Sequence, residues 1–198
     1  MYFLTFISVL IFGLIEGAAA RLHIGRCPNV TTVSNVTLEE LTGVWYEIEK
    51  YDVIMERMFY RCNFLYLSIG KTTKGSEFLY AQKAGNYGRG SRYVTGKIVQ
   101  LNPPSGHMYS RFRASQELVS RKFRHNLILF DPDNYAVFYG CDSYWFGSEY
   151  MWAYSRSPLI PTNTLAYIHE QMRRQGVDLK DLVYTDQAQC LLRENNNI

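Results

Sequence analysis

The sequence predicts an all-β fold: an eight-stranded antiparallel up-and-down β-barrel with one C-terminal α-helix packed on its outside. Three observations predict it. Aromatic residues make up 15% of the 198 residues, with 16 Tyr and 11 Phe, and both residue types favour strands. Eight short segments of strand composition follow one another at regular intervals. A single amphipathic helical pattern comes after them.

An apolar segment precedes the barrel. Residues 2–15 are almost all apolar, Glu16 and Gly17 interrupt the run, and Ala18–Ala20 follow. A short apolar run that ends in small residues is typical of a secretory signal peptide, and this one is too short to span a bilayer comfortably. We therefore predict a signal peptide over residues 1–20 and a single domain over residues 21–198, with an uncleaved anchor as the alternative.

Cysteines and glycosylation sequons agree with secretion. The chain contains four cysteines, Cys27, Cys62, Cys141 and Cys190, and none of them forms a CxxC pair. This pattern favours disulfides over a zinc or redox site, although spacing alone allows three connectivities. Asn29 and Asn35 each begin an N-x-T sequon. Together these features predict a secreted, disulfide-bonded extracellular glycoprotein.

The eight predicted strands lie between residues 44 and 155. They are Val44–Tyr51, Cys62–Ile69, Glu77–Lys83, Arg92–Leu101, His107–Arg113, Asn126–Phe130, Tyr135–Asp142 and Glu149–Ser155. Runs rich in Gly, Pro, Asn and Asp separate many of them, as at 70–75, 85–90, 102–106 and 131–134. Eight strands can close into a barrel that has room for one small ligand.

The predicted helix follows the last of these strands. Residues 161–163 offer N-terminal capping chemistry, and Gly176 is suited to the C-terminal cap. The apolar stripe consists of Leu165, Ile168 and Met172. Such a stripe predicts packing against the outside of the barrel. A short strand, Leu182–Thr185, is predicted after the helix.

Three sequence blocks resemble the signature blocks of the lipocalin family. They are Gly43–Glu49 in the first strand, Asp131–Tyr135 in the turn before the seventh, and Trp152–Arg156 at the end of the eighth. The chain is similar in particular to the branch of apolipoprotein D and the insect bilin-binding proteins, where a Cys-Pro pair, here Cys27-Pro28, also precedes the first block. The second block departs from the family pattern: Phe130-Asp131-Pro132 stands where Thr-Asp-Tyr is usual, which allows a different local turn.

The resemblance implies structural roles for two groups of residues. Trp45, in the block that begins at Gly43, would pack across the closed end of the barrel, and Arg156 would lie over its indole. A guanidinium on an indole face contributes about 0.5–2 kcal/mol. The resemblance also pairs Cys27 with Cys141 and Cys62 with Cys190.

The resemblance further implies reversible binding and transport of a small hydrophobic ligand in the barrel, without covalent chemistry or a cofactor. Trp152 matches a pocket-lining Trp of the apolipoprotein D branch. Five tyrosines are added as cavity candidates because a buried Tyr combines apolar area with a hydroxyl that needs a partner. They are Tyr46, Tyr66, Tyr93, Tyr109 and Tyr139. Strand alternation in the sequence does not fix which face each one occupies.

Apolar residues are predicted in loops at the open mouth of the barrel. They are Ile54, Met55 and Phe59 in the first loop and Trp145 and Phe146 in the seventh. Since loop tips are normally polar, these residues indicate a portal for a lipophilic ligand that could also touch a membrane, a lipoprotein or a receptor. The alternative is that they fold inward and narrow the cavity.

Basic residues are frequent between positions 81 and 126, where Glu117 is the only acid. The nine are Lys83, Arg89, Arg92, Lys97, Arg111, Arg113, Arg121, Lys122 and Arg124. A basic rim at the mouth would favour an anionic ligand, such as a fatty acid or a bilin with propionates. A solvated basic face is the alternative reading.

Other chemistry finds little support in the sequence. The net charge of +3 does not by itself imply nucleic acid, and the four histidines lack metal-ligand spacing. A lipocalin enzyme of the prostaglandin isomerase type depends on a free thiol, whereas all four cysteines match disulfide positions; we therefore predict no enzymatic activity. The second hypothesis is a lipocalin whose mouth loops act on a receptor or protease, with no essential small ligand.

Overall fold

The computed structural model describes residues 21–23, 25–52, 61–87, 90–114, 121–142, 147–188 and 190. The predicted signal peptide lies outside these residues, as do the predicted mouth residues Ile54, Met55, Phe59, Trp145 and Phe146.

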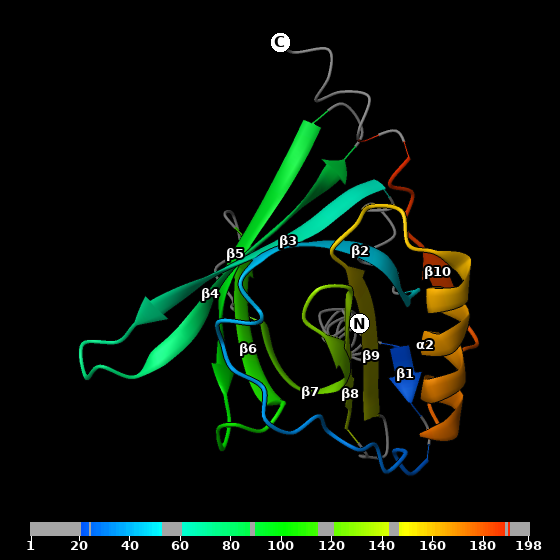
Figure 1. The fold of residues 1–198 in the computed structure, drawn as a ribbon, viewed down its shortest axis with the longest axis horizontal. Helices are drawn as coiled ribbons and strands as arrows, with labels where there is room; N and C mark the ends of the chain where they lie inside the picture. The colour runs from blue at the N-terminus through cyan, green and yellow to red at the C-terminus, as the bar shows by residue number, and fades with distance from the viewer. Residues whose placement is uncertain are drawn as a thin grey trace, which may run out of the picture.

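Eight antiparallel strands form a closed barrel. They are β2 (Gly43–Tyr51), β3 (Arg61–Lys71), β4 (Glu77–Tyr87), β5 (Gly90–Gln100), β6 (His107–Ala114), β7 (Arg121–Asp131), β8 (Tyr135–Cys141) and β9 (Gly147–Ser155). Each strand pairs with the next, and β9 also pairs with β2, so the eight strands form a closed ring, which Figure 1 shows. The predicted barrel is therefore confirmed.

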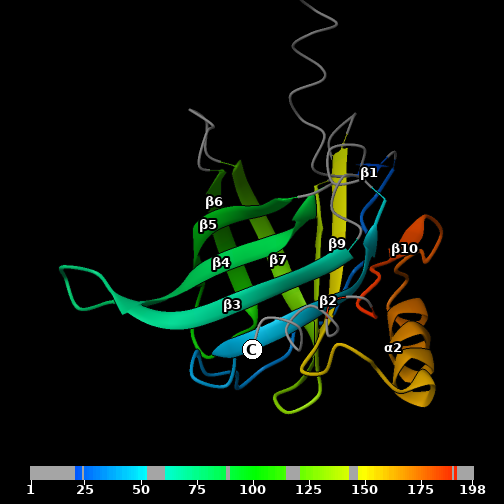
Figure 2. The same cartoon turned by 90° about the horizontal axis from the view of Figure 1, so that it is seen from above.

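Strand β7 is longer than its sequence suggests. It begins at Arg121 rather than at Asn126, because Arg121 and Lys122 pair with Phe112 and Arg111 of β6. Backbone pairing with β6 therefore extends the strand beyond the predicted Asn126–Phe130. Figure 2 shows a second extension, the β3–β4 hairpin, which projects away from the barrel.

The outside of the barrel carries a helix and two short strands. Strand β1 (Arg21–His23) pairs with β9, and β10 (Leu182–Tyr184) pairs with β2. Helix α2 (Thr162–Arg174) lies beside them (Figure 1) and buries Ile168 and Met172 in an apolar cluster with residues of β2, β8 and β9. This confirms the predicted helix packed outside the barrel.

The ends of α2 differ in how they are capped. The N-cap residue is Pro161 and no side chain caps the helix there, so the predicted capping chemistry is not found. At the other end Gly176 has a φ of +77°. The amide of Gly176 donates to the carbonyl of Arg173, and that of Val177 to the carbonyl of Met172. These bonds satisfy carbonyls in the last turn, as a glycine C-terminal motif does.

Trp45 and Arg156 lie against each other where β2 begins and β9 ends. Trp45 is buried, its indole Nε1 donates to the carbonyl of Leu41 at 2.8 Å, and the Arg156 guanidinium lies 3.6 Å from its ring centroid. The guanidinium also donates to three backbone carbonyls at 2.8–2.9 Å, those of Glu40, Thr42 and Pro132. Gly43, with a φ of +97°, is required beside it, because a Cβ there would lie 3.1 Å from Arg156 Nη1.

The turn that departs from the family pattern still supports this end. Asp131 organises it: one carboxylate oxygen accepts the amide of Asp133 at 3.1 Å, and the other accepts the side-chain amide of Asn134 at 2.9 Å. Pro132 supplies one of the carbonyls that bind Arg156. The unusual residues therefore leave the contact between this turn and Arg156 in place.

Two disulfides attach the chain termini to the barrel. Cys27 is bonded to Cys141 of β8, and Cys62 of β3 is bonded to Cys190. These are the pairs that the family resemblance implies. The bridges span sequence separations of 114 and 128 residues. Constraining loops of that length in the unfolded chain is worth about 4–5 kcal/mol each in the entropy model.

Arg156→Ala should reduce the free energy of unfolding by about 2–4 kcal/mol, because several carbonyls and the indole face lose their partner. Urea unfolding of the oxidised protein measures this. Arg174→Ala is the matched control, since it removes an exposed pair with Glu170 that is worth about 0.5 kcal/mol or less. Equal losses in the two variants would contradict a structural role for Arg156.

Candidate ligand-binding site in the barrel interior

Strand register separates the inward side chains from the outward ones. Trp45 pairs with Leu65, and Leu65 pairs with Lys83, so these three side chains share one face. The apolar residues of this face form a buried cluster inside the barrel. It includes Trp45, Leu65, Leu67, Leu79, Met108, Leu127 and Phe138. Their neighbours along each regular strand point outward.

Trp152 is the one predicted cavity residue, among those with described side chains, that points inward. It pairs with Lys50 of β2 and Phe138 of β8, and it packs against the interior cluster. Its side chain is only partly buried. Tyr150, two residues earlier on the same strand, holds its ring 5.4 Å from that of Trp152.

The tyrosine predictions need correction. Tyr46 follows inward Trp45, and Tyr109 follows inward Met108, so both lie on the outer face. Tyr66 is also outward and 42% exposed. Tyr139 is buried, but in the cluster beneath α2, where its hydroxyl donates to Glu149 at 2.6 Å. The side chain of Tyr93 lies outside the described residues.

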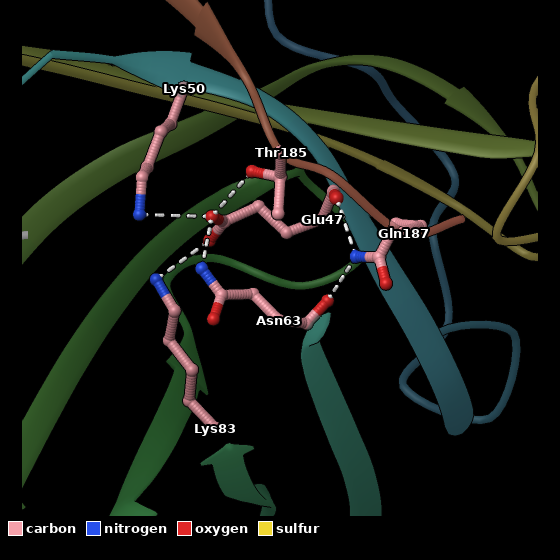
Figure 3. A network of polar contacts seen from close by, with 6 residues as sticks. All are labelled: Glu47, Lys50, Asn63, Lys83, Thr185 and Gln187. Atoms are coloured by element: carbon pink, nitrogen blue, oxygen red, sulfur yellow. Dashed lines mark hydrogen bonds and ion pairs between the residues drawn. The ribbon is translucent and has the colours of Figure 1, made fainter. Parts of the chain in front are cut away.

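A buried carboxylate forms the centre of the interior polar groups. Glu47 is fully buried, with Lys50 Nζ 3.0 Å from Oε1 and Lys83 Nζ 2.8 Å from Oε2 (Figure 3). The side chains of Asn63 and Thr185 donate to Oε1 at 2.8 Å and 3.0 Å. Burial alone would raise the pKa of Glu47, but the charges of Lys83 and Lys50 and the hydrogen bonds from Lys83 and Asn63 lower it to about 2.

The C-terminal segment completes this network. Strands β2 and β3 pair only from Gly43 to Tyr46, and beyond that point Gln187 lies between them. Its side-chain amide donates to the carbonyl of Glu47 at 2.9 Å and to that of Asn63 at 2.7 Å. Gln187 thus replaces pairing between the two strands and satisfies two buried carbonyls.

Sequence reasoning missed Glu47, Lys50 and Asn63. A signal was present for Glu47, because it stands two residues after Trp45 and shares its face. No such signal existed for Lys50, since a register irregularity between Glu47 and Glu49 changes the alternation. Asn63 and Gln187 come together only through the C-terminal segment, which local sequence does not position.

A second polar pair lies on β6 and β7. His125 is in register with Met108 of the interior cluster and is 7% exposed. Its Nε2 lies 3.4 Å from Ser110 Oγ. Burial lowers the pKa of His125 from 6.5 to about 4. The imidazole is therefore uncharged near neutral pH.

The comparisons with known proteins agree with the barrel fold. No family model matches the chain. Mouse apolipoprotein D is 26% identical over 189 residues, covering 86% of this chain and 87% of the mouse protein. Guinea pig (Cavia porcellus) apolipoprotein D is 25% identical, covering 94% and 96%. Insecticyanin from Manduca sexta superimposes with a TM-score of 0.70 at 19% identity, covering 87% of this chain and 92% of that one.

The chain has the lipocalin fold. Its similarity to apolipoprotein D confirms the branch that the signature blocks indicate. H1 crustacyanin from the lobster Homarus americanus has the same fold, with a TM-score of 0.63 at 17% identity, covering 88% of this lipocalin and 100% of that chain. The amine-binding protein of Rhodnius prolixus, solved as a tryptamine complex, has a TM-score of 0.61 at 16% identity, with 81% and 86% covered.

The predicted basic rim of this lipocalin also needs correction. Lys83 points into the barrel. Lys97 and Arg111 are neighbours in strand register on the outer face of β5 and β6. Arg124 is exposed and pairs with outward Tyr109. These four cations therefore divide between interior and outer wall. Arg89 and the side chains of Arg92, Arg113, Arg121 and Lys122 lie outside the described residues.

No group of three or more His, Cys, Asp or Glu side chains in the described residues could hold a metal ion. No helix in them has both the length and the apolar character that a membrane crossing needs. All four cysteines are used in the two disulfides.

Acidification should destabilise this lipocalin through His125. Because its folded pKa of about 4 lies below the unfolded value of 6.5, the unfolded chain takes up the proton first as the pH falls. The contribution is complete above pH 6.5 and is lost by about pH 4, a change of about 3 kcal/mol. Urea unfolding at several pH values should show this loss in the parent protein and not in His125→Phe. A control variant at exposed His107, His107→Phe, should keep the parent pH profile, and an unchanged profile in His125→Phe would contradict the assignment.

Proposed function

We propose that this lipocalin is a secreted carrier that reversibly binds a small hydrophobic ligand inside the barrel. The observation that carries the proposal is the position of Trp152, which points inward yet is only partly buried. Lys83 Nζ lies 5.7 Å from its ring centroid, and the Lys83 side chain is 20% exposed. An apolar wall with a few placed polar groups is typical of small-molecule sites. The similarity to apolipoprotein D and to a tryptamine-binding protein supports the same proposal.

The charges beside Trp152 favour an anionic ligand. Glu47 contributes one negative charge, and Lys50 and Lys83 contribute two positive charges, so these three residues carry +1 together. Charge in a poorly hydrated interior acts strongly on a ligand. A fatty acid or another carboxylate with an apolar body fits this arrangement. An interior cation, and not a basic rim at the mouth, would attract the carboxylate of such a ligand.

The state of the cysteines agrees with ligand binding that involves no covalent bond. All four cysteines are in disulfides, so the chain offers no free thiol as a nucleophile. Secretion is supported by the apolar leader over residues 1–20, by the disulfides and by the two sequons. Asn29 and Asn35 are both exposed, as glycosylation requires.

The predicted mouth residues would contact a membrane, a lipoprotein or a receptor. They are Ile54, Met55, Phe59, Trp145 and Phe146. The same residues would serve the alternative function, in which the barrel is a scaffold for protein binding. Ligand titration separates the two functions, because the scaffold needs no small ligand.

Trp152→Ala should weaken oleate binding about tenfold or more, because loss of an aromatic contact surface costs about 1.4 kcal/mol or more. Isothermal titration calorimetry of the oxidised, delipidated protein measures the dissociation constant. Tyr66→Ala is the control, since Tyr66 lies on the outer face, and it should bind oleate like the parent. Unchanged affinity in Trp152→Ala would remove Trp152 from the site. If the parent protein bound neither oleate nor oleyl alcohol, the protein-binding alternative would replace the carrier function.

Lys83→Met should lower the affinity for oleate about tenfold while leaving that for oleyl alcohol within about twofold, since only the carboxylate uses the charge. The same calorimetric titration measures both ligands. Lys97→Met removes an outer cation of equal charge and should change neither affinity. Parallel losses for acid and alcohol would show that Lys83 acts through packing and not through its charge.

A further inference from the structure

The Ser110–His125 pair lies in the same barrel interior as Trp152, on the strands farther round the ring. Ser110 pairs with Ile98, and His125 pairs with Met108. Both partners belong to the interior apolar cluster. Ser110 is 2% exposed and His125 is 7% exposed. Both polar side chains are therefore enclosed by the barrel.

One nitrogen of this histidine has no hydrogen-bond partner within the described residues. Nε2 lies 3.4 Å from Ser110 Oγ, whereas Nδ1 is buried with no donor or acceptor in reach. A buried polar atom without a partner costs free energy, and such atoms are rare in folded proteins. Neutral imidazole presents one donor and one acceptor nitrogen, so Nδ1 can donate or accept according to the tautomer.

An aromatic wall connects this histidine with Trp152. The rings of His125 and Phe138 meet edge to face with centroids 5.4 Å apart. Phe138 is in turn the register partner of Trp152. Beyond Trp152 comes Lys83 with its carboxylate partner. Along the inside of the barrel, the uncharged His125 is thus followed by the rings of Phe138 and Trp152 and then by the charged Lys83.

We propose that His125 Nδ1 is a hydrogen-bonding subsite for an uncharged polar group of the ligand, and that this group is a hydroxyl remote from the anionic end. The inference rests on the proposed carrier function and specifies its ligand class: an amphiphile with an apolar body, a carboxylate at one end and a hydroxyl toward the other. A hydroxyl suits either tautomer of His125, because it both donates and accepts. Ser110 positions the ring through Nε2.

The test compares fatty acids with their terminally hydroxylated partners. The probes are decanoic and 10-hydroxydecanoic acid, dodecanoic and 12-hydroxydodecanoic acid, and hexadecanoic and 16-hydroxyhexadecanoic acid. A buried site that hydrogen-bonds a hydroxyl discriminates against the ligand that lacks it. We expect the hydroxy acid of at least one length to bind about tenfold more tightly than its parent acid, as measured by calorimetry on the oxidised protein.

Three variants assign such a preference to His125. His125→Phe should abolish it while leaving affinity for the parent acid within about twofold, which also reports that the barrel is folded. His125→Gln retains hydrogen-bonding groups and should keep part of the preference. His107→Phe, at an exposed position, should keep all of it. If His125→Phe did not fold, the preference for hydroxy acids would be compared between the parent protein and His125→Gln. An equal preference in both would then contradict the subsite.

The outcomes separate the subsite from the carrier function. Binding of all six acids with no preference at any length would overturn the subsite and leave the carrier function standing. A preference that survived in a folded His125→Phe would overturn it equally. If the parent protein bound none of the acids, the carrier function and the subsite would both fall.

Discussion

The buried carboxylate of Glu47 is the interaction on which the arrangement of β2, β3, β4 and the C-terminal segment depends. It accepts hydrogen bonds from β3 and from the C-terminal segment, and it pairs with two lysines of the interior. Taking a carboxylate out of water is costly unless partners compensate. Here the compensation comes from four side chains on four separate segments of the chain. The carboxylate therefore links β2, β3, β4 and the C-terminal segment through its partners.

The two disulfides fit this arrangement. Cys62 lies next to Asn63, which binds the carboxylate, and Cys190 follows Gln187, which bridges the carbonyls of Glu47 and Asn63. The bond between them holds the C-terminal segment where the β2–β3 pairing stops. Where β2 begins, Arg156 plays a comparable part by binding the carbonyl of Glu40, which precedes β2, and that of Pro132 in the turn before β8. Glu47 and Arg156 are thus each a charged group that bonds to more than one segment of the chain.

Much of the fold could be predicted from the sequence, because strand composition, turn residues and the three signature blocks are local signals. The site could be predicted only in part. Trp152 belongs to the third signature block, so its place in the barrel could be predicted. Whether a tyrosine faces the interior depends on the register of its strand, and a shift of one residue moves its side chain to the other face of the sheet. Tyr139 illustrates why burial could not settle it: α2 buries part of the outer wall, so a buried tyrosine need not face the interior. Lys50 escaped prediction because a bulge in β2 shifts its register.

The distribution of polar groups inside the barrel indicates which interior residues serve stability and which would serve ligand binding. Around Trp45 the interior is filled by apolar side chains. Polar residues enter on the inward face farther along the strands, at Lys83 and His125. A core built for stability alone would place apolar residues at these positions. Keeping a histidine neutral and enclosed makes the fold sensitive to acid, and this cost is understandable if the imidazole hydrogen-bonds a group that the chain itself does not supply.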